Sequence, residues 1–208
     1  MTRAPRLILA SVSPRRAALM REYGYDVEVI TPPFDEPAAA RDDLPPAQLA
    51  EAFSYLKARS VAALVDAALI VAGDTIVSLG GRVFGKPVDR DDARVILSAL
   101  TGTTHDVITG VTALDVETGK RLIRHDRTAV TMKPMSDAEL EAYLDTGAWA
   151  GKAGAYGIQD YGDAFVERIE GSFTNVVGFP MELLGRMLSE WGVESHESAK
   201  PSRSEPRP

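Results

Sequence analysis

The stretch ALIVAGDTIVSL, residues 68–79, carries the strongest strand signal of the sequence. Apolar residues surround Asp74 and Thr75, and Gly80 and Gly81 follow as a pair typical of a tight hairpin turn. An ionised carboxylate is costly to bury without a partner. The stretch therefore predicts a long buried strand that turns back at its end. It carries one acid, Asp74, whose burial requires a partner or a chemical role.

Helix and strand signals mix on both sides of this strand. Before it, the pattern predicts a strand over 6–12, a helix from 14 to about 24, a strand over 26–30, and a helix from 46 whose apolar stripe extends to Leu64. After it, we expect a helix over 89–100, antiparallel strands over about 105–116 and 120–132, a helix from 136 to about 147, a strand over 164–169 and a helix over about 180–191. Hairpins combined with helical crossovers indicate an α/β fold with a mixed, partly antiparallel sheet and flanking helices.

Composition limits the kinds of protein that this sequence can be. Its 208 residues and 45% hydrophobic content suit one domain, or two lobes that share a sheet. The formal net charge of -7 argues against long nucleic acids or anionic membranes as partners, so a small anion would need a local basic pocket. Because the chain has no cysteine and only 3 histidines, we expect any metal to be held by oxygen.

The chain lacks the apolar segments of membrane and secreted proteins. No apolar run approaches the ~18 residues of a membrane span, and the apolar part of MTRAPRLILAS is too short for a signal peptide. We therefore expect a cytoplasmic protein. Residues 195–208 have almost nothing to bury, which predicts a disordered tail after a single domain over residues 1–194.

The stretch LILASVSPRRAALM, residues 7–20, joins a strand to a helix through polar residues. The free N–H groups of a helix start, two serine hydroxyls and two guanidinium groups together suit a phosphate. Alternatively, Arg15 and Arg16 form a solvated first turn, although the helix dipole disfavours cations there. We favour phosphate binding, with Ser11 and Ser13 beside the arginines.

Three other residues have both a structural and a chemical interpretation. Asp74 is either the acid of a structural ion pair, or a metal ligand or general base for water. Lys86 lies in GGRVFGKP, which resembles a P-loop but ends in Pro87, and proline offers neither a hydroxyl nor an N–H, so we reject a P-loop. Lys86 can still reach a phosphate as a point charge, or be an ordinary surface lysine. Gln159 ends a glycine-rich loop, where its amide can pair with a pyrimidine edge or face water.

Several fragments gain specificity from their order along the chain. They are LASVSPRR (9–16), FDE (34–36), LKA (56–58), AGDTIV (72–77), GKP (85–87), TGTTHDVITGV (101–111) and KAGAYGIQ (152–159). Together they resemble the Maf family of nucleoside triphosphate pyrophosphatases over roughly residues 6–191. The resemblance implies two lobes around a deep cleft, a homodimer as in several members, and metal-dependent hydrolysis of a nucleoside triphosphate to the monophosphate and pyrophosphate.

The resemblance also implies roles for residues at matching positions. Asp74 would be the proton acceptor and, with Glu36, would hold Mg²⁺ or Mn²⁺. Substrate selection would fall to Arg15, Thr75 and Gln159, a trio that resembles the members acting on dTTP and UTP. The residues implied around the triphosphate are Ser11, Ser13, Arg16, Lys57 and Lys86.

Two positions depart from familiar members of this family, and two alternatives stay open. Ala72 and Gly73 precede Asp74 where Gly-Ala is frequent, and Gly85 precedes Lys86 where an acid can occur. The substrate could be a modified pyrimidine nucleotide, or the protein could be a nucleotide-responsive regulator of septum formation in cell division that does not turn substrate over. An acid facing phosphate-binding bases favours turnover, because binding alone would not need it.

Overall fold

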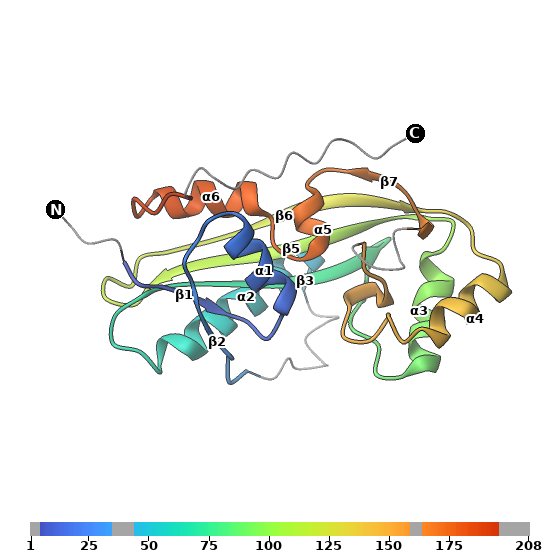
Figure 1. The fold of residues 1–208 in the computed structure, drawn as a ribbon, viewed down its shortest axis with the longest axis horizontal. Coiled ribbons are helices and arrows are strands. Elements are labelled where there is room, and N and C mark those ends of the chain that lie inside the picture. The colour runs from blue at the N-terminus through green and yellow to red at the C-terminus, as the bar shows by residue number, and fades with distance from the viewer. Residues whose placement is uncertain (1–4, 35–43, 159–163, 196–208) are drawn as a thin grey trace.

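The computed structural model describes residues 5–34, 44–158 and 164–195 (Figure 1). The elements in chain order are β1 (Leu7–Ala10), α1 (Pro14–Glu22), β2 (Glu28–Ile30), α2 (Pro46–Ala62), β3 (Leu69–Leu79), β4 (Arg82–Phe84), α3 (Arg90–Leu100), β5 (Thr104–Asp115), β6 (Arg121–Met132), α4 (Asp137–Asp145), the 3₁₀ helix η2 (Ala153–Ala155), β7 (Val166–Glu170), α5 (Phe173–Val177) and α6 (Met181–Ser189). The expected long strands and helices are confirmed, with ends that differ by a few residues.

One local expectation is wrong, and one short helix was missed. The helix α2 ends at Ala62, and the N–H of Leu64 donates to the carbonyl of Val61 in the turn that follows. Leu64 is therefore 60% exposed and does not extend the apolar stripe. The short helix α5, which Ser172 caps, was not expected at all. Residues 196–208 of the predicted tail lie outside the described part of the chain.

The described strands form one 7-stranded mixed sheet in the order β2-β1-β3-β5-β6-β7, with β4 paired to β3 off this path. The strand β1 runs parallel to both β2 and β3. The pairs β3–β4, β3–β5, β5–β6 and β6–β7 are antiparallel. The predicted α/β class with a mixed, partly antiparallel sheet and flanking helices is thus confirmed.

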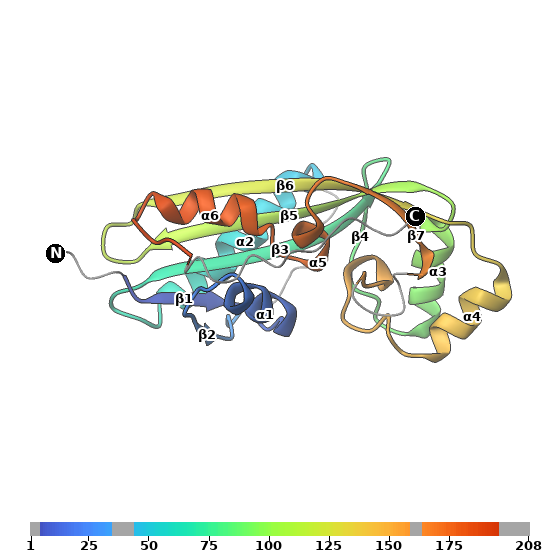
Figure 2. The same ribbon diagram turned by 45° about the horizontal axis from the view of Figure 1, so that its top comes forward.

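Helices cover both faces of this sheet (Figures 1 and 2). On one face α1, α5 and α6 pack against side chains such as Leu9 and Val71, and on the other α2 packs against Ile8 and Ile70. Successive side chains of a strand point to opposite faces, so burial on both faces explains the continuous apolar run of β3. At one end of the sheet, α3, α4 and η2 enclose a separate apolar cluster. No helix in the described ranges is long and apolar enough to cross a membrane.

The central strand β3 has an open edge midway along its length. The β1 ladder ends where Ala10 faces Ala72, and the β4 ladder begins where Phe84 faces Val77. Between these two ladders, residues 73–76 face no described strand on that side, although β5 pairs with them on the other. The open edge lies just beyond the carboxyl end of β1, a common location for ligand sites in α/β sheets.

Candidate active site

A cavity of about 800 Å³ lies at the open edge of β3. The turn between β1 and α1, the helix α2, the strand β3, the segment after β4 and two later loops all contribute to its wall. Eight predicted site residues lie in the described part of the chain, and every one lines this cavity: Ser11, Ser13, Arg15, Arg16, Lys57, Asp74, Thr75 and Lys86. Glu36 and Gln159 lie outside the described residues, so their placement stays a prediction.

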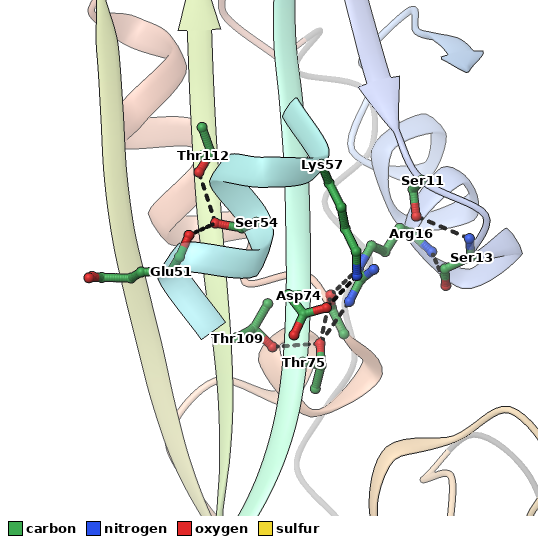
Figure 3. A network of polar contacts seen from close by, with 11 residues as sticks. Ser11, Ser13, Arg16, Glu51, Ser54, Lys57, Asp74, Thr75, Thr109 and Thr112 are labelled. Carbon is green, nitrogen blue, oxygen red and sulfur yellow. Dashed lines mark hydrogen bonds and ion pairs between the residues drawn. The ribbon is translucent and has the colours of Figure 1, made fainter. Parts of the chain in front are cut away.

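Asp74 and Lys57 form a buried ion pair at the cavity (Figure 3). The Nζ of Lys57 donates to Oδ1 of Asp74, and the two residues are 8% and 6% exposed. The ammonium compensates a carboxylate that would otherwise be costly to bury. The structural interpretation of Asp74 therefore holds. It does not exclude a chemical role, because a carboxylate has acceptor sites beyond the one that an ammonium uses.

Close packing of α2 on the sheet fixes the position of Lys57. Gly110 of β5 lies directly beneath the helix, and a Cβ there would be 2.2 Å from both the backbone carbon and the oxygen of Ala50. The hydroxyls of Ser54 and Thr112 are 2.8 Å apart and join α2 to β5 (Figure 3). Because Lys57 follows Ser54 by three residues, it lies on the same side of the helix.

Arg16 is held on the opposite face of β3 by Thr75. The Nε of Arg16 donates to the carbonyl of Gly178 at 2.7 Å, and one terminal nitrogen donates to Oγ1 of Thr75 at 2.9 Å. The Thr75 hydroxyl is itself 2.9 Å from the hydroxyl of Thr109 on β5. These contacts orient the guanidinium at the cavity (Figure 3). They also give Thr75 a structural task that the sequence did not predict.

Gly73 allows the ring of Phe179 and the guanidinium of Arg16 to approach β3 closely. A Cβ on Gly73 would lie 2.9 Å from a ring carbon of Phe179 and 3.3 Å from Nε of Arg16. The first distance is shorter than real Cβ contacts, so a larger residue would have to displace the phenylalanine. Glycine directly before Asp74, one of the two departures noted from the sequence, thus has a packing explanation.

The turn between β1 and α1 is built as its sequence predicts. Pro14 occupies the first helical turn, and Ser13 caps the helix by accepting from the N–H of Arg16. The hydroxyl of Ser11 accepts from the N–H of Ser13 at 3.0 Å. A hydroxyl that accepts one bond can still donate another, so both serines can serve an anion beside the start of the helix. Arg15 lines the cavity and is partly exposed.

The segment that carries Lys86 does not have P-loop geometry, as predicted. The strand β4 pairs with β3 in a hairpin, and the next described helix begins only at Arg90. Lys86 is exposed and lines the cavity. The N–H of Gly154 donates to the carbonyl of Gly85 at 3.1 Å, which joins this segment to the glycine-rich loop.

The glycine-rich loop, residues 150–158, is anchored by three aromatic or imidazole side chains. The hydroxyl of Tyr143 donates to the carbonyl of Ala155 at 3.2 Å, and Nε2 of His105 is 2.7 Å from the hydroxyl of Tyr156. Burial lowers the pKa of His105 to about 4, against a smaller opposing effect of Asp106. Burial also raises the pKa of Tyr156, so both partners are neutral near pH 7.

One cation of this cavity was missed by sequence reasoning. Lys152 lines the cavity and is 8% exposed. A lysine in a glycine-rich loop reads as a surface residue, since nothing local reveals its burial. Its position as the first residue of KAGAYGIQ was the one available signal.

The described residues contain no group of three or more histidines or acids that could hold a metal ion. Among the described residues that line the cavity, Asp74 is the one acid. Magnesium is usually held by one or two carboxylates together with water and substrate phosphates. The donor set of this cavity therefore fits a divalent ion that shares its ligands with a bound phosphate compound.

Comparison with known proteins assigns the chain to a family. The profile described as "Maf-like protein" matches residues 6–191. This chain belongs to the Maf family. The resemblance inferred from its ordered fragments is thereby confirmed, and the Maf match includes every segment that lines the cavity.

Relatives with the name dTTP/UTP pyrophosphatase match most of this chain, and three of them are given as examples. The protein of Alkaliphilus metalliredigens is 45% identical over 184 residues, which cover 88% of this chain and 94% of the relative. That of Symbiobacterium thermophilum is 41% identical over 186 residues, covering 89% and 94%. That of Pelotomaculum thermopropionicum is 40% identical over 186 residues, covering 89% and 96%. The similarity covers most of this chain and nearly the whole length of each of the three relatives.

Proposed function

We propose that this protein hydrolyses dTTP and UTP to the corresponding monophosphate and pyrophosphate. Relatives named dTTP/UTP pyrophosphatase are 40% to 45% identical to it over most of the chain. The cavity contains the kinds of group that such a reaction requires, which are an acid that can accept a proton from water and positive groups that can bind a triphosphate.

The distribution of charge is the observation that carries this proposal. The whole chain has a formal net charge of -7. Yet the described residues lining the cavity include one acid, Asp74, and five cations: Arg15, Arg16, Lys57, Lys86 and Lys152. A cavity wall that carries five cations and one acid in an otherwise acidic protein suits a small polyanion, because its local charge attracts negative groups.

Asp74 is the proton acceptor in the reaction that we propose. Water attacks the α-phosphorus, its proton passes to Asp74, and the bond from the α-phosphorus to the bridging oxygen breaks to release pyrophosphate. Arg16, Lys57 and Lys86 neutralise charge on the phosphates, with Ser11 and Ser13 donating at the start of α1. Positioning of this kind can supply about 7–11 kcal/mol of the barrier.

A divalent ion, Mg²⁺ or Mn²⁺, would be held by Asp74, by Glu36 and by oxygens of the substrate. When bound, it would polarise phosphoryl oxygens and offset the charge that develops during attack. Lys57 stabilises the ionised form of Asp74, and this is the form that can hold the ion and accept a hydrogen bond from the attacking water.

Selection of a pyrimidine base falls to Arg15, Thr75 and Gln159 in this proposal. Thr75 acts through Arg16, because its hydroxyl accepts from that guanidinium at 2.9 Å. Gln159 can donate to a carbonyl and accept from the N3–H of thymine or uracil. A purine would leave such polar groups unpaired, which can discriminate strongly between bases.

A pyrophosphate-release screen over nucleoside triphosphates, with Mg²⁺ or Mn²⁺, tests this function. We expect dTTP and UTP to be the best substrates among the standard nucleotides. Faster hydrolysis of a modified pyrimidine nucleotide would move the physiological substrate to that compound. No pyrophosphate from any nucleotide with either metal would contradict the proposal and favour the regulator of septum formation.

The domain organisation, cellular location and oligomeric state of the enzyme are part of the same proposal. We infer that residues 1–194 form one domain with two lobes, that it acts in the cytoplasm, and that it pairs as a homodimer. These inferences follow from family membership and from the nature of the substrates. Sedimentation of the purified protein would test the dimer.

A further inference from the structure

Thr109 of β5 lies directly opposite Thr75 of β3 in the sheet. Opposite residues of an antiparallel pair point to the same face, and the two hydroxyls meet there at 2.9 Å (Figure 3). Thr75 lines the cavity, whereas Thr109 is 0% exposed. Because Thr109 cannot touch a ligand, it can act on one only through a neighbour such as Thr75.

The other side of Thr109 is attached to the helix α5. Its hydroxyl donates to the carbonyl of Asn175 at 3.3 Å. Asn175 is itself 0% exposed, and its side-chain amide donates to the hydroxyl of Thr128 on β6 at 2.9 Å. These contacts fasten α5 to the sheet just before Gly178. Thr109 therefore joins the hydroxyl of Thr75 to a buried part of the core.

These contacts set the direction of the Thr75 hydroxyl. The single proton of Thr109 goes to Asn175, so Thr75 donates the bond between the two threonines. The oxygen of Thr75 is then left to accept from the guanidinium of Arg16 at 2.9 Å. The other described acceptor near the Thr75 proton is the carbonyl of Gly178. That carbonyl is farther away, at 3.4 Å, and already accepts from Nε of Arg16 at 2.7 Å.

We propose that Thr109 is a positioning residue that sharpens the selection of pyrimidine nucleotides, an inference that rests on the proposed function. Its hydroxyl holds the Thr75 hydroxyl in the orientation that accepts from Arg16. Without it, the proton of Thr75 turns toward the carbonyl of Gly178, and the guanidinium loses a fixed partner. Polar groups that can shift adapt more easily to the wrong base, so the site discriminates less.

The substitution Thr109→Val tests this assignment. Valine has nearly the same shape as threonine and lacks the hydroxyl. The measured quantity is the ratio of kcat/KM for dTTP to kcat/KM for dGTP, from pyrophosphate release with Mg²⁺ at enzyme concentrations that quantify the slower nucleotide. We expect this ratio to fall roughly 3- to 10-fold, as for the loss of one neutral hydrogen bond. An unchanged ratio would overturn the inference.

The ratio separates positioning from a merely structural role. A smaller fraction of folded enzyme reduces both kcat/KM values by the same factor and leaves their ratio unchanged. Thr128→Val is the matched control, because Thr128 is also 0% exposed and its hydroxyl contacts Asn175 and the carbonyl of Ser172 rather than Thr75. It should lower the urea midpoint and leave the ratio unchanged. An equal fall of the ratio in this control would mean that a general loosening of α5 is responsible, and the inference would be wrong.

Two further variants show whether the hydroxyl acts through Thr75. Thr109→Ser retains the hydroxyl and should keep the ratio within about twofold of the wild type. Thr75→Val should lower the ratio, and Thr109→Val added to it should lower the ratio no further, because both changes interrupt one path. The inference does not survive if serine fails to rescue the ratio, or if the losses in the double variant multiply.

The inference and the proposed function fail in different ways. If the wild-type protein releases pyrophosphate from dTTP and Thr109→Val keeps the ratio, the inference fails and the proposed function stands. If the wild-type protein releases none from any nucleotide, the proposed function itself fails, and this inference fails with it.

Discussion

Removal of Lys57 should destabilise the fold more than removal of both charges of its ion pair. In Lys57→Met, the carboxylate of Asp74 is left in a site that is 6% exposed. Breaking a buried pair by removing one partner costs about 3–5 kcal/mol. In the double variant Lys57→Met/Asp74→Asn no charge is left behind, and a buried amide with imperfect partners costs about 1–3 kcal/mol. The double variant should therefore be more stable than Lys57→Met by roughly 2 kcal/mol.

Urea unfolding at pH 7 of the wild type, both single variants and the double variant completes the cycle. The control is Arg6→Met, which breaks an ion pair whose side chains are 52% and 48% exposed and should cost less than about 1 kcal/mol. A double variant no more stable than Lys57→Met, with no coupling between the two changes, would refute the argument that the pair is effectively desolvated.

Two further predictions concern stability. Gly110→Ala should lower the free energy of unfolding by about 3 kcal/mol or more, because the new Cβ would lie 2.2 Å from the backbone of Ala50. It should also reduce activity, because the helix that carries Lys57 must shift. Gly185→Ala in α6 is the control and should not destabilise the protein, since the nearest atom to its Cβ is 3.4 Å away. Folding lowers the pKa of His105 from 6.5 to about 4, so as pH falls the imidazole is protonated in the unfolded chain before it is protonated in the folded protein. The contribution of His105 to the free energy of unfolding is therefore present above pH 6.5 and is lost as pH falls toward 4. Its size is roughly 3 kcal/mol. Urea midpoints at pH 7.5 and pH 5 should differ less in His105→Gln than in the wild type, and an equal difference would contradict this.

Local signals predicted much of the fold because they act over a few residues. Ser13 and Pro14 start α1 as expected, and the central strand around Asp74 was evident from its apolar run. The short helix α5 was missed because tertiary contacts hold it in place. The side-chain amide of Asn175 donates to the carbonyl of Val107 and to the hydroxyl of Thr128, and no local pattern indicates either partner.

The candidate site was predictable in its residues but not in its geometry. Motif order identified Arg16 and Thr75 separately, whereas their hydrogen bond depends on how β1 and β3 pair and on the return of the chain to Gly178. The burial of Lys152 depends on its contact with Gly157, five residues later, in a loop without a regular period. Contacts of this kind form only in the assembled fold, so the local sequence around each residue does not predict them.

The role of Asp74 is best tested by pyrophosphate release from dTTP with Mg²⁺, compared between the wild type and Asp74→Asn. Both proteins should be assayed well below their unfolding midpoints. We predict release by the wild type and at least a roughly 100-fold lower turnover by Asp74→Asn, because the amide cannot accept the proton of the attacking water. Turnover by the folded variant close to that of the wild type would contradict the mechanism.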